Sequence, residues 1–360
     1  AILIQNYCDL TLQSMTISGG DETVYTMSNN HGNVVIKDTT INAGKAQGYS
    51  YGPYAFDVCG YSTYTGVSVS VENSTINGNI EISKSNGNTY DATLTLGSGT
   101  KVNGSISDGG NGDKVTVTKD TSVNVAAPDG YKWVDGENGQ TLAKIVMVAE
   151  VNGKQYETLQ AAIDAASKNQ TVKLLNNTKE NVTIAKALTL DLNGKTLNGG
   201  QVKGTPALKV DNASVTIQDS SAAQTGTIMR EDTAENSGKT SHYVIDVQGK
   251  YGFLKFEGGN VKNNSGVVGV KGASLVRVGD DSNRNANPTL TITGGTFTQD
   301  NFIAIKVDFG TLYLKGGTVN SKNSYAVENW RTANIDGATV NGSVASWVYD
   351  GGVTTSTLNI

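Results

Sequence analysis

The chain is poor in the residues that build small cross-linked folds. Its 360 residues include only two cysteines, four prolines and four methionines, and aromatic residues make up 7% of the total. Two cysteines cannot form a disulfide scaffold or a cysteine-based zinc site. Few prolines beside 43 glycines favour ordered β-structure with tight turns over a flexible linker.

The two cysteines, Cys8 and Cys59, are also too far apart to pair. If Ile17 and Ile76 are equivalent repeat positions, the thiols are about two strand spacings, or roughly 10 Å, apart. A disulfide tolerates at most about 7 Å between Cα atoms. We therefore expect two unpaired thiols.

Long apolar runs and a basic surface are missing too. No apolar run reaches the roughly 18 residues that cross a bilayer, so we expect no membrane insertion. The net charge is −5 and the sequence pI is about 5.2, which argues against a nucleic-acid partner. The sequence opens at Ala1 without a signal peptide, inside what resembles a running repeat, so we expect part of a longer multi-module chain.

What the chain does have is a repeated phrase. LTITGGTF (residues 290–297), LYLKGGTV (312–319) and ANIDGATV (333–340) begin 22 and then 21 residues apart. The same form occurs in LTLQSMTI (10–17), VVIKDTTI (34–41), VSVENSTI (69–76), LDLNGKTL (190–197) and LKFEGGNV (254–261). A fixed period of this length is typical of stacked repeats.

Each phrase predicts two short strands joined by a bend. Its first three positions alternate apolar and polar, as in a strand with one buried face. A second alternating piece lies between phrases, as in YVIDV (243–247), VVGV (267–270), IAIKV (303–307) and YAVEN (325–329). Three strands per period that cannot bury their own apolar face predict an all-β parallel β-helix, with a rise of roughly 4.8 Å per coil.

The repeats predict two tandem β-helices. The first covers residues 1–125 and is incomplete at its N-terminus, and the second covers 169–360. Between them, residues 126–156 predict connector hairpins: YKWV and TLAK flank one turn, and Asn152-Gly153 forms another. In the segment 157–168, Leu159, Ala162, Ile163 and Ala166 share one helical face, so we expect a short helix that caps the open end of the second β-helix.

The segment from residue 126 to residue 200 resembles a known kind of module. VNGKQYETLQAAIDAASK, TVKLL and LTLDLNGKTL are similar to the opening of right-handed, pectate-lyase-like β-helix modules in bacterial cell-surface proteins, and APDGYKWVDGENGQTLAKI resembles the connector between them. This resemblance implies a right-handed β-helix, an extracellular location and an adhesive role. It implies no site residues.

Signals for catalysis are weak. Asp280-Asp281 resembles the paired aspartates of β-helix hydrolases, but the flanking family elements are absent, and a solvated loop is the expected structure. His31 and His242 fall in different β-helices, and DGGNGDK (108–114) nearly matches a calcium-binding nonapeptide but is not repeated. We expect no catalytic residues, no metal site and no cofactor.

One segment favours binding. Residues 48–66 contain Tyr49, Tyr51, Tyr54, Tyr61 and Tyr64, and tyrosine suits sugar and protein contacts. We expect these tyrosines to bind a ligand and Phe56 to point into the core. A second aromatic set comprises Tyr325, Trp330, Trp347 and Tyr349, in which Trp330 and Trp347 are expected to stack on adjacent coils.

The sequence therefore predicts a non-catalytic segment of a bacterial surface protein, acting as adhesin or stalk. Its expected partner is a host surface glycan, mucin or protein, and its expected location is extracellular. The alternative is a polysaccharide-degrading β-helix enzyme, a lyase or glycoside hydrolase, which should carry converging carboxylates in one lateral groove. A purely structural spacer without a ligand is a third possibility.

Overall fold

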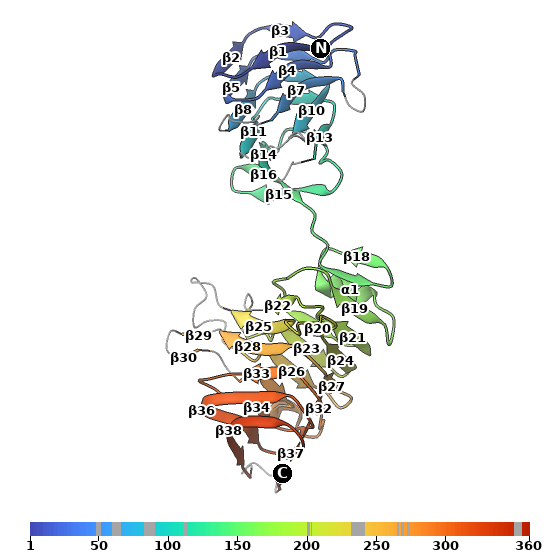
Figure 1. Ribbon diagram of the computed structural model, residues 1–360, viewed down its shortest axis with the longest axis vertical. Coiled ribbons are helices and arrows are strands. Elements are labelled where there is room, and N and C mark those ends of the chain that lie inside the picture. Colours follow the sequence, from blue (N-terminus) through green and yellow to red (C-terminus); the bar gives the residue numbers. More distant parts are fainter. Residues whose placement is uncertain are drawn as a thin grey trace. The chain divides into compact units, whose positions relative to one another are not determined.

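The computed structural model describes residues 1–47, 52–59, 66–82, 91–110, 114–199, 202, 204–231, 242–264, 266–267, 270–271, 274–348 and 355–360. The chain forms two compact units, Ala1–Ile145 (unit 1) and Val146–Ile360 (unit 2). Each has its own hydrophobic core. Each is described by itself below (Figure 1).

The strands of unit 1 belong to three sheets among its described residues. One sheet has the order β1 (Ile2–Asn6), β4 (Tyr25–Asn29), β7 (Tyr54–Val58), β10 (Asn79–Ile82) and β13 (Ile106–Asp108). Another has the order β15 (Tyr131–Gly136), β16 (Gly139–Lys144), β14 (Val115–Lys119), β11 (Ala92–Leu96), β8 (Val67–Glu72), β5 (Gly32–Lys37) and β2 (Leu10–Gln13). The third has the order β12 (Lys101–Asn103), β9 (Thr75–Asn77), β6 (Thr40–Asn42) and β3 (Thr16–Ser18).

Neighbours within a sheet of unit 1 lie about one repeat apart in the sequence. The chain visits each sheet once per repeat, a circuit that we call a pass, and the strands of successive passes pair in parallel. Val34, Val69, Leu94 and Val117 stand in register on four successive passes, and each is at most 1% exposed. The alternation in the sequence therefore becomes a row of buried aliphatic side chains. Phe56 is fully buried in this core, as predicted.

A hairpin ends unit 1. β15 and β16 pair antiparallel, as the sequence predicted, and β16 pairs antiparallel with β14. Trp133 and Leu142 on this hairpin pack against the core. The indole nitrogen of Trp133 donates to the carbonyl oxygen of Val125 at 2.9 Å. The hairpin thus covers the last parallel strand, β14, with antiparallel structure.

Unit 2 opens with the second predicted hairpin. β17 (Ala149–Val151) and β18 (Lys154–Tyr156) pair antiparallel, and β17 also pairs antiparallel with β19 (Thr171–Leu174). The turn residues Asn152 and Gly153 have φ values of 51° and 76°. Two consecutive positive φ values are what a tight Asn-Gly hairpin turn requires.

The one α-helix among the described residues is α1 (Leu159–Ala165), within the predicted segment. Leu159, Ala162 and Ile163 are at most 1% exposed and Ala166 is 4% exposed, so the predicted buried face is confirmed. These side chains belong to the same core cluster as those of β19 and β20 (Val182–Ile184). The helix therefore covers the first strands of unit 2.

The other strands of unit 2 form two large sheets and one small pair. The ten-stranded sheet continues from β18, β17 and β19 through β21 (Leu188–Asp191), β24 (Ser214–Gln218), β27 (Phe253–Phe256), β32 (Thr289–Ile292), β35 (Thr311–Leu314), β37 (Thr332–Ile335) and β39 (Thr357–Asn359). The eleven-stranded sheet contains β20, β23 (Leu208–Asp211), β26 (Ile245–Gln248), β31 (Val276–Val278), β34 (Ile305–Val307), β36 (Thr318–Asn329), β33 (Thr296–Thr298), β28 (Asn260–Asn264), β25 (Thr227–Glu231), β22 (Thr196–Asn198) and β38 (Thr339–Ser346). The pair is β29 (Gly266–Val267) with β30 (Val270–Lys271).

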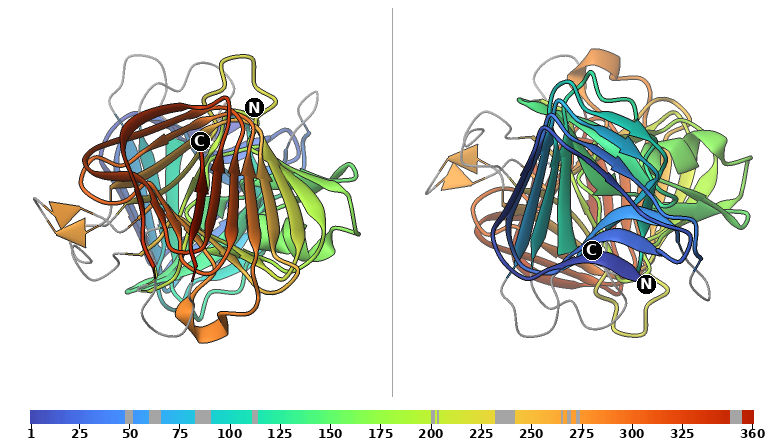
Figure 2. Two further views of the ribbon diagram at one scale, coloured as in Figure 1. Left: turned by 90° about the horizontal axis from the view of Figure 1, so that it is seen from below. Right: turned by 90° about the horizontal axis from the view of Figure 1, so that it is seen from above.

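The three repeated segments that begin at residues 290, 312 and 333 form neighbouring parallel strands on successive passes. Leu290 pairs in register with Leu312, which pairs with Ala333, and the three side chains are fully buried. Phe297 pairs with Val319 in the same way. Figure 2 shows the sheets of unit 2 curling around a shared interior, which the aliphatic core fills. The protein is therefore all-β, with large and mainly parallel sheets, an arrangement compatible with a β-helix.

Candidate functional site

The tyrosine segment predicted to bind a ligand is described only in part. Tyr49, Tyr51, Tyr61 and Tyr64 lie outside the described residues. Tyr54 is 7% exposed, and its ring stacks on that of Tyr25 at a centroid distance of 5.1 Å. The Tyr25 hydroxyl donates to Glu81 at 2.8 Å. Tyr54 therefore contributes to packing. The binding role of this segment stays a prediction.

A groove on the eleven-stranded sheet of unit 2 brings together side chains that the sequence did not connect. Its volume is ≈ 470 Å³. Its walls come from residues 204–206, from His242, from the outward side chains of β23 and β26, and from the segment between Arg277 and Asn283. Polar side chains from separate passes therefore line one depression.

A first row of outward side chains is set by strand register. It starts in the groove, which Lys209, Asp246 and Arg277 line, and continues beyond the groove lining. Lys209 pairs with Asp246, Asp246 with Arg277, Arg277 with Lys306, and Lys306 with Glu328. These positions alternate with buried residues such as Val247, Val278 and Val307, so their side chains face outward. We call these five residues the charged row.

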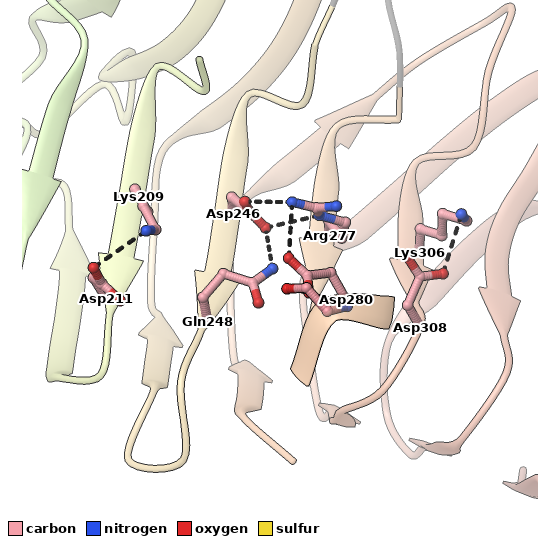
Figure 3. Close-up of polar contacts among 9 residues, drawn as sticks. Lys209, Asp211, Asp246, Gln248, Arg277, Asp280, Lys306 and Asp308 are labelled. Carbon is pink, nitrogen blue, oxygen red and sulfur yellow. Dashed lines mark hydrogen bonds and ion pairs between the residues drawn. The ribbon is translucent and has the colours of Figure 1, made fainter. Parts of the chain in front are cut away.

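The centre of the charged row is a bidentate ion pair (Figure 3). Arg277 Nε donates to Asp246 Oδ1 at 3.0 Å, and Nη2 donates to Asp246 Oδ2 at 2.8 Å. Gln248 Nε2 also donates to Asp246 Oδ1, at 2.6 Å. The Asp246 side chain is 5% exposed, and the Arg277 guanidinium lies 4.6 Å from the Tyr243 ring centroid. Both charged groups are thus held in one orientation.

A second row lies beside the first, toward the C-terminal ends of the strands. It consists of Asp211, Gln248, Asp280 and Asp308, and we call it the acceptor row (Figure 3). Lys209 Nζ lies 3.1 Å from Asp211 Oδ2, and Lys306 Nζ lies 3.1 Å from Asp308 Oδ1. Every member carries at least one side-chain oxygen that can accept a hydrogen bond. This edge of the groove therefore suits ligand groups that donate.

Asp280 enters the groove through a short 3₁₀ helix, η2 (Asp281–Asn283). Its carboxylate caps this helix by accepting from the Ser282 backbone N–H at 2.8 Å, and it also accepts from the Ser282 hydroxyl. Asp280 Oδ2 lies 3.5 Å from Arg277 Nη2. The predicted solvated loop is therefore confirmed for Asp281, whose side chain is 64% exposed. It is wrong for Asp280, whose side chain is 22% exposed.

The environment lowers the pKa of one carboxyl in the groove and raises the pKa values of two carboxyls of the rows that lie beyond the groove lining. Burial alone would raise the pKa of Asp280, but hydrogen bonds from Ser282 and the Arg277 charge outweigh it and lower that pKa. Burial raises the pKa of Asp308, and the Lys306 charge offsets only part of this effect. Burial raises the pKa of Glu328 as well. The acids of the two rows therefore differ in how readily they ionise.

The surroundings raise the pKa values of two basic side chains of the charged row. Burial alone would lower the pKa of Arg277, but the hydrogen bonds and charge of Asp246 reverse this and raise it. For Lys306 the attraction of Asp308 likewise outweighs burial and raises the pKa. His242 differs, because burial and the Arg230 charge lower its pKa and favour the neutral ring. At neutral pH, Arg277 carries a positive charge in the groove, and Lys306 carries one farther along the charged row.

The predicted aromatic stack begins at Trp330, two residues after Glu328 of the charged row, and Tyr349 of the predicted set lies outside the described residues. The rings of Trp330 and Trp347 are stacked with centroids 6.1 Å apart, which confirms the prediction. Tyr325 meets Trp347 edge-on at 6.4 Å. Trp347 is 44% exposed, so the stack presents part of an aromatic surface beyond Glu328.

The sequence contained a signal for this groove that pattern reading missed. In YVIDV, IAIKV and YAVEN the alternation was used only to predict strands, whereas the charged residue in each occupies the same repeat position. Asp246, Lys306 and Glu328 would have aligned, with Arg277 of LVRV between them. His242, for which the sequence predicted no role, and Asp246 both line the groove. Arg277, Lys306 and Asp308 belong to no catalytic or binding motif that the sequence predicted.

Neither a metal site nor a membrane-crossing helix is found in the part of the chain that the structure describes. There, no group of three or more His, Cys, Asp or Glu side chains is arranged to hold a metal ion. Within the same residues, no helix is long and apolar enough to cross a membrane. Neither cysteine forms a disulfide; Cys8 is exposed and Cys59 is buried.

Comparisons with known proteins add no relatives to this description. No protein-family model matches the chain, and neither a curated protein nor a solved structure matches it. The groove therefore has to be interpreted from its own chemistry.

Proposed function

We propose that the chain is a non-catalytic segment of an extracellular bacterial surface protein, built as right-handed, pectate-lyase-like parallel β-helices, and that the groove of unit 2 binds an extended saccharide. The resemblance of residues 126–200 to bacterial surface modules supports the setting. The observation that carries the binding role is the pair of polar rows that begin in the groove. The expected partner is a surface glycan or mucin.

The chemistry of the two rows supports a saccharide ligand. Sugar hydroxyls both donate and accept, so they need fixed partners of both kinds. The charged row offers N–H donors on Lys209, Arg277 and Lys306, and the acceptor row offers oxygens on neighbouring passes. Parallel strands repeat these outward positions about every 4.8 Å, with a cation from β23, β31 and β34 and a carboxylate from β26 in the charged row. A ligand that lies across the strands would meet the same pair of rows at each step.

The pre-orientation of the side chains also supports binding. Asp246, Arg277 and Gln248 hold one another through the hydrogen bonds described above, so ordering them on binding costs little conformational entropy. In the groove, Asp246 lies within β26 and Asp280 caps η2, and their side chains are 5% and 22% exposed. Fixed groups of this kind favour specificity over loose ionic attraction.

The test is a glycan and mucin binding screen with a matched pair of double variants. Lys209→Met/Asp211→Asn removes a half-exposed ion pair from the groove. Lys255→Met/Glu257→Gln removes an equally exposed pair from the ten-stranded sheet, whose atoms lie 2.6 Å apart. We expect a glycan to bind the wild type and the second variant, and to bind the first variant at least about tenfold more weakly. Equal binding by all three proteins, or no binding to any glycan, would refute the proposed function.

One observation favours a polysaccharide-degrading enzyme as the second candidate. Asp280 has a lowered pKa and Asp308 a raised one, and such divergence is typical of acid–base pairs. Against this, Asp280 caps η2 and Asp308 contacts Lys306, so both carboxylates already have partners. We expect no reducing ends or unsaturated products from pectin, host glycans or chitin-type polymers. Turnover that is lost in Asp280→Asn or Asp308→Asn would establish the enzyme instead.

A further inference from the structure

The balance of charge in the groove narrows the kind of saccharide that fits. The charged and acceptor rows together contain five carboxylates and three cations. The groove itself is lined by the carboxylates of Asp211, Asp246 and Asp280 and by the cations of Lys209 and Arg277. Lys306, Asp308 and Glu328 continue the rows beyond the groove lining. With all groups ionised, the rows carry more negative than positive charge.

The three cations are already engaged by carboxylates of the rows. Lys209 contacts Asp211, Lys306 contacts Asp308, and Arg277 contacts both Asp246 and Asp280. A ligand carboxylate or sulfate would have to displace one of these partners and would leave a buried carboxylate without its cation. That exchange is unfavourable where the displaced group is only 5% exposed, as Asp246 is. The groove therefore disfavours acidic sugars.

The carboxylates also have partners, but each offers about four lone-pair sites and can accept further hydrogen bonds. Asp280 receives only one long ion contact, at 3.5 Å, from an arginine whose best hydrogen bonds go to Asp246. The side chains of Asp211 and Asp280, which line the groove, are 43% and 22% exposed, so an additional positive charge can reach both carboxylates. An ammonium group brings that charge together with three N–H donors.

We infer that the saccharide recognised by the groove is an amino sugar whose free amine is protonated, with the amine toward the acceptor row and the neutral hydroxyls toward the charged row. This inference rests on the proposed saccharide-binding function and adds its substrate class. The acceptor row supplies carboxylates on both sides of Gln248, from Asp211 and Asp280. An N-acetylated unit lacks the charge, and a uronate carries the opposite one.

The experiment compares three short oligosaccharides of equal length: glucosamine, N-acetylglucosamine and galacturonate oligomers, each titrated calorimetrically into the full chain. We expect the glucosamine oligomer to bind at least about tenfold more tightly than the N-acetylated one, and the galacturonate oligomer more weakly than either. The preference should shrink with added salt. It should vanish when the pH is raised enough to deprotonate the amine.

A protein of net charge −5 attracts any polycation, so the control removes an equal charge elsewhere. Asp211→Asn and Glu257→Gln each neutralise one carboxylate, the first in the groove and the second on the ten-stranded sheet. We expect only Asp211→Asn to reduce the preference for the free amine. An equal loss in both variants, or tight binding of a neutral or acidic oligomer instead, would overturn the inference while leaving saccharide binding intact. Failure of all three oligomers and of the glycan screen would remove the proposed function as well.

Discussion

Asp219 shows how a single carboxylate joins successive passes of the chain. It is 6% exposed, and it accepts from the backbone N–H groups of Gly194, Ser221 and Gly226 at 2.6–3.0 Å. Burial alone would raise its pKa, but these backbone hydrogen bonds lower it. Asp219→Ala should therefore reduce the free energy of unfolding by about 3 kcal/mol at neutral pH.

The pH dependence of this effect has a definite sign. Because the folded-state pKa of Asp219 lies below the unfolded value of about 3.9, its contribution is complete well above that value and is lost as the pH falls through the folded pKa. Urea unfolding at pH 7 and at pH 3 measures the difference between wild type and variant, which should shrink at the lower pH. Asp300→Asn, at an exposed residue, should change little at either pH. An unchanged difference would contradict this role for Asp219.

The ion pair between Arg277 and Asp246 yields a second prediction at this scale. Arg277→Met leaves a 5% exposed carboxylate without its cation, so we expect a loss of about 3 kcal/mol in the free energy of unfolding. Adding Asp246→Asn removes the stranded charge and should restore most of the loss. The double-mutant cycle is measured by urea denaturation. Strictly additive effects would show that the two groups do not interact.

Among the elements, α1 carries the sharpest prediction. Leu159→Asp/Ile163→Asp introduces two charges at positions that are at most 1% exposed, so unit 2 should lose more than about 4 kcal/mol and aggregate. Ala161→Asp, on the exposed face of the same helix, is the control and should remain soluble. Thermal unfolding and light scattering measure both. A soluble double variant with wild-type melting would refute the idea that the helix is a cap.

The elements that sequence reasoning predicted share a physical feature. Local alternation and the Asn152-Gly153 turn act over a few residues, so the strands, both hairpins and α1 followed from pattern alone. The groove did not, because its geometry depends on register between passes of unequal length. Asp246 and Arg277 are 31 residues apart, whereas Lys306 and Glu328 are 22 apart. A fixed sequence period therefore did not align these four residues. The binding site was predicted in the tyrosine-rich segment instead.

At the scale of the whole molecule, each unit has a core of its own. Phe256 and Phe297, whose ring centroids are 4.8 Å apart, belong to the core cluster of unit 2, and Phe56 belongs to the core cluster of unit 1. Phe297→Ala should therefore lower the melting temperature of unit 2, at a cost of about 4 kcal/mol, and leave that of unit 1 unchanged. Differential scanning calorimetry should show one of two transitions shifted. A uniform shift of a single transition would contradict separate cores.

We propose above that the paired rows on β23, β26, β31 and β34 bind a saccharide. The most direct measurement is a crystal structure of the full chain with a bound glucosamine oligomer. We expect electron density for the oligomer along these strands, with an amine nitrogen within hydrogen-bonding distance of Asp211 or Asp280. Density for the oligomer at residues 48–66, or anywhere other than the groove, would contradict it.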